Sequence, residues 1–136
     1  MARILVVDDD VAVRQVARLM LEAHGFQVAE VSDGVEAVRV FGREHADLIL
    51  CDVLMPRKDG LQTIRELRAL HPEVRVIAMT GGGRNVDLLG TARDFGAVEV
   101  LRKPFDAAAI VGAVGRALRS QSPAGSCEGR SLTADA

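Results

Sequence analysis

Five short apolar runs recur along the chain at fairly even spacing, and each is followed by a helical pattern. The runs read RILVV, FQVAEV, DLILC, VRVIAM and VEVL. Most of them are nearly continuous in apolar character, which predicts strands buried on both faces, as in parallel sheets. Regular alternation of strand and helix implies right-handed crossovers. The chain is therefore expected to fold as a three-layer α/β domain.

Apolar residues three or four positions apart predict a helix after each expected strand. In chain order the stripes are Val13, Val16, Ala17 and Met20; Ala37, Val38 and Phe41; Leu61, Ile64 and Leu67; Leu88, Leu89, Ala92 and Phe95; and Ile110, Ala113, Val114 and Ala117. Gly25, Pro72 and Gly96 each come just past a stripe, as helix-ending residues do. Asp33, three residues before Glu36, predicts a capped helix start.

Polar side chains follow four of the expected strands. Residues 8–10 are all Asp and follow the first strand, Asp52 follows the third, Thr80 the fourth and Lys103 the fifth. Ligands of parallel sheets bind at the carboxyl ends of the strands, so these side chains are expected to share one crevice. Crowded acids resist ionisation unless a cation lies among them. Mg²⁺ binds carboxylate and phosphate oxygens, and an Asp can attack phosphorus to give an aspartyl phosphate.

The segments VVDDD, LILCDVLMPRKDG, VIAMT and VLRKPF, in this order, resemble the receiver domain of two-component response regulators. The resemblance covers roughly residues 3–119. It implies a flavodoxin-like, doubly wound parallel sheet of five strands in the order 2-1-3-4-5, with helices on both faces. It also implies that Asp52 is the phosphoacceptor and that Asp9 binds Mg²⁺ directly. Asp8 would bind the ion largely through water, and the backbone carbonyl of Leu54 would complete the protein ligands.

The same resemblance assigns Thr80 as the switch hydroxyl and Lys103 as the lysine that pairs with phosphate. It also implies a cis peptide bond between Lys103 and Pro104. The chain departs from the family at Val100, because receivers usually carry Tyr or Phe three positions before the lysine. Val100 has no ring to move and only one side-chain torsion. We therefore expect the signal to pass mainly through the loop that begins at Thr80.

The resemblance implies a stand-alone receiver that takes a phosphoryl group from a histidine kinase or a histidine phosphotransfer protein. It would signal by contact with a downstream protein and would catalyse only its own phosphorylation and dephosphorylation. A net charge of −2 gives no general attraction to nucleic acid or to anionic membranes. No apolar run approaches the roughly 18 residues of a membrane span, and no signal peptide opens the chain. Cys51 and Cys127 look unsuited to pairing, which favours a cytoplasmic location.

Composition divides the chain into two parts. Residues 1–119 are expected to form the receiver domain. Residues 120–136 are rich in Ser, Gly and Ala and have no apolar period, so they are expected to be a disordered tail or the remnant of a linker.

Other readings fit parts of the pattern. Haloacid-dehalogenase-like phosphohydrolases also place Asp-x-Asp after the first strand, which would make Asp8 the nucleophile and Asp10 the acid or base. That reading leaves Asp52 without a role and lacks an acidic pair after the lysine. A pseudo-receiver would keep the fold and never carry phosphate. Asp10 can also simply cap the first helix, and Cys51 is expected to be a small buried apolar residue.

Overall fold

The computed structural model describes residues 2–53, 60–81 and 96–119, apart from the Leu61 side chain. The helix expected around residues 88–95, the expected ligand Leu54 and the expected tail at residues 120–136 lie outside the described residues.

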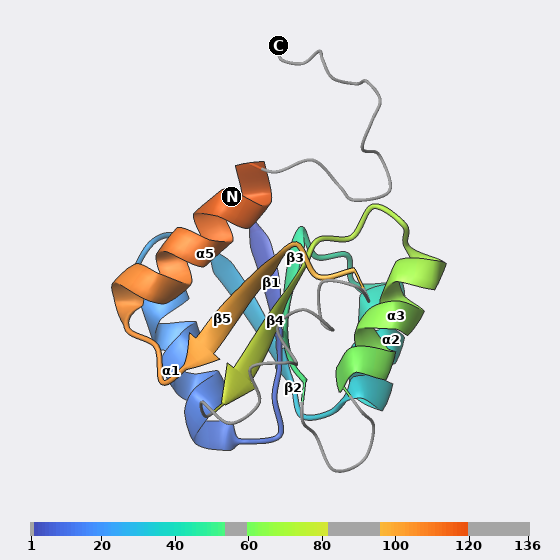
Figure 1. Ribbon diagram of the computed structural model, residues 1–136, viewed down its shortest axis with the longest axis horizontal. Coiled ribbons are helices and arrows are strands. Elements are labelled where there is room, and N and C mark those ends of the chain that lie inside the picture. Colours follow the sequence, from blue (N-terminus) through green and yellow to red (C-terminus); the bar gives the residue numbers. More distant parts are fainter. Residues whose placement is uncertain (1, 54–59, 82–95, 120–136) are drawn as a thin grey trace.

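Five parallel strands form a single sheet (Figure 1). Its strand order is β2-β1-β3-β4-β5, which confirms the order implied by the family resemblance. The strands are β1 (Arg3–Val7), β2 (Gln27–Val31), β3 (Leu48–Asp52), β4 (Val76–Gly81) and β5 (Glu99–Lys103). Every residue of the central strand β3 is buried, as the continuous apolar run predicts.

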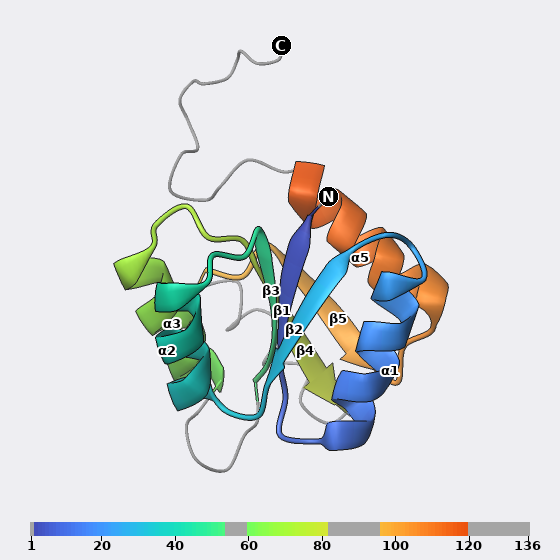
Figure 2. The ribbon, with the colours of Figure 1, turned by 180° about the vertical axis from the view of Figure 1, so that it is seen from behind.

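Two pairs of helices cover the two faces of the sheet (Figures 1 and 2). The described helices are α1 (Val11–Glu22), α2 (Gly34–Arg43), α3 (Gly60–Leu70) and α5 (Ala107–Arg119). Helices α1 and α5 pack on one face, and α2 and α3 pack on the other. None of the helices in the described ranges combines the length and apolar character needed to cross a membrane.

Each face of the sheet has its own apolar cluster, because successive side chains of a strand point to opposite faces. In β1, Ile4 and Val6 join the cluster under α1 and α5. Leu5 and Val7 join the cluster under α2 and α3. Cys51 is fully buried in this second cluster, which agrees with its expected role as a small apolar residue.

Side chains cap the two helices that begin on the expected signals. The Asp33 carboxylate accepts a hydrogen bond of 2.9 Å from the Glu36 backbone N–H, which confirms the predicted start of α2. The Asp10 carboxylate accepts one of 2.9 Å from the Ala12 N–H and caps α1. Each cap satisfies a backbone donor that the first turn of a helix leaves without a partner.

Candidate functional site

The parallel register brings the predicted site residues to one edge of the sheet. Asp8 directly follows β1, Asp52 is the last residue of β3, and Lys103 is the last residue of β5. Thr80 is the last residue but one of β4, and Gly81, which follows it, pairs with Lys103. The structure therefore places all four residues at the carboxyl ends of neighbouring strands, where ligands of such sheets bind.

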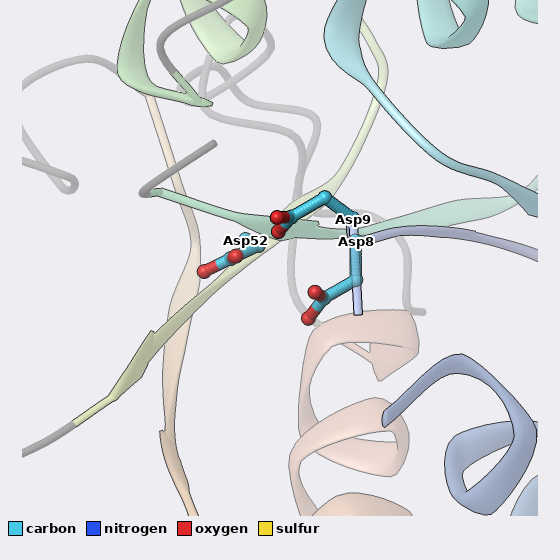
Figure 3. A group of neighbouring side chains, drawn as sticks. All are labelled: Asp8, Asp9 and Asp52. Atoms are coloured by element: carbon cyan, nitrogen blue, oxygen red, sulfur yellow. The ribbon is translucent and has the colours of Figure 1, made fainter. Parts of the chain in front are cut away.

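Three carboxylates meet at this edge. The carboxylate oxygens of Asp8, Asp9 and Asp52 lie within 4.8 Å of one another. Asp8 is fully buried and Asp52 is 5% exposed, whereas Asp9 is exposed. Figure 3 shows the carboxyl groups of Asp8 and Asp9 turned toward the side on which Asp52 lies. Oxygen atoms so arranged form a donor set that suits a hard divalent cation.

Lys103 bridges the two buried acids. Its Nζ atom lies 2.7 Å from Asp8 Oδ2 and 3.4 Å from Asp52 Oδ1. Within the described part of the chain, no hydrogen bond of regular geometry reaches Asp8 Oδ2, so this ion pair is what offsets its charge. Among the described residues, the cluster thus holds three carboxylates, and the Lys103 ammonium pairs with two of them. This surplus of negative charge fits the binding of a cation.

The surroundings of Lys103 act on its pKa in opposite directions. Burial lowers the pKa of Lys103, but the carboxylates of Asp8 and Asp52 more than offset this and raise it above its ordinary value. The ammonium therefore stays charged at neutral pH. Because the pKa is higher in the folded state, the resulting stabilisation is complete below the ordinary pKa of lysine. It is lost as the pH rises through the raised folded-state pKa.

Replacing Lys103 with Met should lower the free energy of unfolding in Mg²⁺-free buffer at pH 7. We expect a loss of about 2 kcal/mol, below the usual cost of breaking a fully buried pair because the lysine is partly exposed. Urea unfolding measures the change. Arg116→Met is the matched control, since it removes an exposed cation paired with Glu99 at 3.4 Å, and it should cost less than about 1 kcal/mol. Equal losses in the two variants would contradict a special role for Lys103.

The cis peptide bond predicted between Lys103 and Pro104 is present. Thr80 is 3% exposed. It lies on β4, which is the neighbour of β3, the strand that ends at Asp52. Val100 lies away from the cluster, earlier in β5, and is partly buried. It lines a surface hollow of about 540 Å³ together with residues of β5 and α5.

An apolar hollow of about 430 Å³ adjoins the site. It is lined by Ala12, Val13, Val16, Lys103, Pro104 and Phe105. Lys103 thus belongs to both the acidic cluster and the wall of this hollow. Exposed apolar side chains of α1 extend this surface, with Val16 41% and Leu19 69% exposed.

Two features of the site were not predicted from the sequence. The Arg14 guanidinium donates a hydrogen bond of 2.6 Å to the backbone carbonyl of Asp8. Gly60, the first residue of α3, packs so closely on the backbone of Asp52 that a Cβ atom would lie 1.9 Å from the Asp52 carbonyl oxygen. The sequence signal for the contact of Arg14 is weak. It is only that a cation lies about one turn into the helix that follows the three Asp residues. Gly60 ends the segment MPRKDG. A glycine at this place predicts a turn, but the sequence does not indicate that it packs on the backbone of Asp52.

Comparison with protein families gives a match over most of the chain. The family model described as the response regulator receiver domain matches residues 4–115. A curated relative, response regulator MprA of Mycobacterium leprae (strain TN), is 36% identical over 121 residues, which are 89% of this chain and 53% of that protein. MprA of Mycobacterium avium (strain 104) is 35% identical over 131 residues, 96% of this chain and 57% of that protein. The chain thus spans about half the length of the curated relatives it matches.

Similar solved structures are also those of response regulators or their receiver domains. The receiver domain of NtrX from Brucella abortus superposes with a TM-score of 0.83 at 30% identity, over 87% of this chain and 99% of that one. A response regulator receiver domain protein from Clostridium thermocellum gives 0.80 at 33% identity, over 87% and 94% of the two chains. The chemotaxis response regulator CheY4 of Vibrio cholerae gives 0.79 at 25% identity, over 86% and 98%.

Proposed function

The chain belongs to the response regulator receiver domain family, and from this premise we propose that it accepts a phosphoryl group on Asp52 in the presence of Mg²⁺. The donor is a histidine kinase or a histidine phosphotransfer protein. The observation that carries the proposal is the meeting of three carboxylates within 4.8 Å beside the Lys103 ammonium. Phosphoryl transfer depends mainly on positioning and on neutralising charge, and this arrangement supplies both.

Asp9 and Asp52 are the residues we assign to direct binding of Mg²⁺. Asp8 supports the ion through water, because its Oδ1 atom already accepts a hydrogen bond of 2.9 Å from the Asp10 N–H. The family resemblance adds the backbone carbonyl of Leu54. When bound, Mg²⁺ supplies positive charge that neutralises the phosphoryl oxygens.

In the proposed reaction, an oxygen of the Asp52 carboxylate attacks phosphorus. A new O–P bond forms, the N–P bond to the donor histidine breaks, and that nitrogen keeps the electron pair. Lys103, already 3.4 Å from Asp52, pairs with a phosphoryl oxygen. We assign to the Thr80 hydroxyl a hydrogen bond to a second phosphoryl oxygen, through which the change passes to the residues that follow β4. Apart from this transfer and the later hydrolysis of the aspartyl phosphate, we assign the chain no enzymatic activity.

The phosphodonor is proposed to approach over the apolar hollow, because Lys103 lines this hollow and also lies 3.4 Å from Asp52. Signalling then passes to a downstream protein by contact, and the proposed location is the cytoplasm. Val100 has no ring to turn inward, so we propose that the signal passes from Thr80, near the end of β4, to the residues that follow this strand. The sequence has Gly at residues 81–83, and glycine as a residue type restricts the backbone less than other residues do.

The partners of the whole protein are also a matter of proposal, because the chain spans only about half the length of the curated relatives it matches. For the receiver itself we propose protein partners. The net charge of −2 on the whole chain offers no general attraction to nucleic acid or to an anionic membrane.

The structure offers little support to a phosphohydrolase. In that reading Asp8 is the nucleophile, but its carboxylate is fully buried and tied to Lys103 and to the Asp10 N–H. Asp10, the acid or base of that reading, uses its carboxylate to cap α1. Asp52, to which such an enzyme gives no role, belongs to the charged cluster and lies 3.4 Å from Lys103.

The test is incubation of the purified chain with acetyl phosphate and Mg²⁺, followed by intact mass spectrometry and peptide mapping. We expect one phosphoryl group on Asp52 and none when EDTA replaces Mg²⁺. Uptake on Asp8 instead would support the phosphohydrolase. Absence of uptake, in a chain shown to be folded, would support the pseudo-receiver.

A further inference from the structure

Arg14 reaches from the first turn of α1 back to the end of β1. Its Nη1 atom donates a hydrogen bond of 2.6 Å to the backbone carbonyl of Asp8. Its Nε atom lies 3.2 Å from Glu30 Oε1 on β2. The side chains of Arg14 and Glu30 are only 16% and 19% exposed, so this contact is weakly screened by solvent. The guanidinium is therefore held between a neighbouring strand and the backbone that leads into the acidic cluster.

The turn that carries the acids is fixed at several points. The Asp8 N–H donates to the Val31 carbonyl at 3.2 Å, which continues the pairing of β1 with β2. The Asp8 carboxylate accepts a hydrogen bond from the Asp10 N–H. Arg14 holds the remaining polar group, the Asp8 carbonyl, which belongs to the peptide that joins Asp8 to Asp9. The orientation of this peptide sets the direction in which the Asp9 side chain leaves the backbone.

We propose that Arg14, braced by Glu30, is a positioning residue that holds Asp9 in the direction required for binding Mg²⁺. Asp9 is exposed, unlike Asp8 and Asp52, so packing does little to direct it. The backbone must do so instead. Charge-assisted hydrogen bonds such as that from Arg14 are the strong ones in proteins, and groups that orient metal ligands commonly affect metal affinity by about tenfold or more. This inference rests on the proposed Mg²⁺ site.

Replacing Arg14 should change the affinity for Mg²⁺ in opposite directions, depending on whether the side chain acts by positioning Asp9 or only through its charge. Arg14 is a cation close to a cation site, so its charge alone repels Mg²⁺. If the charge were all that mattered, replacing Arg14 with Gln would tighten Mg²⁺ binding. If the hydrogen bond to the Asp8 carbonyl orients Asp9, the same replacement weakens binding.

Arg18 provides a matched control on the same helix. Its Nη1 atom lies 2.6 Å from Glu30 Oε2, and its Nη2 atom donates to the Val28 carbonyl. It therefore shares the partner Glu30 with Arg14. Among the described residues, its other hydrogen-bond and ion-pair partners are Glu22 and the Val28 carbonyl. Arg18→Gln removes one positive charge from α1 and the ion pairs to Glu30 and Glu22, while it leaves the hydrogen bond of Arg14 in place.

Isothermal titration with Mg²⁺ alone, on the unphosphorylated full chain, tests the proposal. We expect Arg14→Gln to raise the Kd for Mg²⁺ about tenfold and Arg18→Gln to change it less than about twofold. Thermal melting in EDTA shows that each variant is folded. If Arg14→Gln does not fold, Arg14→Lys replaces it: a single ammonium cannot make the two divergent contacts of the guanidinium, so binding should still weaken.

Three outcomes would overturn the role of Arg14. These are unchanged or tighter binding by Arg14→Gln, equal weakening by Arg18→Gln, and wild-type binding by Arg14→Lys where that variant is needed. Absence of Mg²⁺ binding by the wild-type chain would instead overturn the metal site of the proposed function. The two failures are thus distinguishable.

Discussion

We expect the Asp52→Asn variant to take up no phosphoryl group from acetyl phosphate, because an amide oxygen cannot attack phosphorus as a carboxylate does. The loss should be complete, whereas the Asp8→Asn variant should be phosphorylated more slowly through poorer Mg²⁺ binding. Intact mass spectrometry over a time course measures both. Asp8→Asn is the matched control, since it makes the same change of charge and shape at the other buried acid.

Loss of folding should not explain the result. Asp52→Asn relieves repulsion among three carboxylates and leaves Lys103 its closer contact with Asp8, at 2.7 Å. The free energy of unfolding without Mg²⁺ should therefore stay within about 1 kcal/mol of the wild-type value. Phosphorylation of Asp52→Asn together with inactivity of Asp8→Asn would refute Asp52 as the phosphoacceptor.

Replacing Gly60 with Ala should damage both fold and site. A Cβ atom at this position would lie 1.9 Å from the Asp52 carbonyl oxygen and 2.5 Å from Val53 Cα. Both neighbours are backbone atoms, so no side chain can rotate away to make room. The start of α3 or the end of β3 must move instead, at a cost of about 3 kcal/mol in the free energy of unfolding. Because β3 ends at Asp52, we also expect slower phosphorylation.

Gly42→Ala is the control for this prediction. Gly42 lies on an exposed position of α2, and a Cβ atom there would meet nothing within 4 Å. Alanine favours the helix more than glycine does, so this variant should gain about 0.5 kcal/mol. Urea unfolding of the two variants gives the comparison. A Gly60→Ala protein as stable and as readily phosphorylated as wild type would show that the close approach of α3 to Asp52 is unimportant.

The elements of this fold could be predicted because local and global signals agree in the sequence. Continuous apolar runs marked β1, β3 and β4 as strands buried on both faces, and Asp33 marked the start of α2. The order of the strands could not be predicted in this way. The hydrophobic pattern indicates that a strand exists but not which strands lie beside it, so the predicted order came from the resemblance to a family.

The sequence predicted which residues lie together at this edge of the sheet better than it predicted the contacts among them. The rule that ligands bind at the carboxyl ends of parallel strands grouped Asp8, Asp52, Thr80 and Lys103 correctly. The rule does not predict that Lys103 lies nearer to Asp8 than to Asp52, because the two distances, 2.7 and 3.4 Å, differ by less than an ångström. It also missed Arg14, because a long flexible side chain on a helix can reach many acceptors.

The acidic residues at the carboxyl ends of the strands can change without changing the fold. Asp8, Asp9 and Asp52 belong to neither of the apolar clusters that hold the sheet between its helices. A single substitution at Asp52 therefore removes the carboxylate that we propose as the phosphoacceptor while the protein keeps the same architecture. Related proteins with such a substitution would retain the fold and could serve only as binding modules. Among related proteins, the residue at the end of β3 is thus a better test of the proposed reaction than overall similarity is.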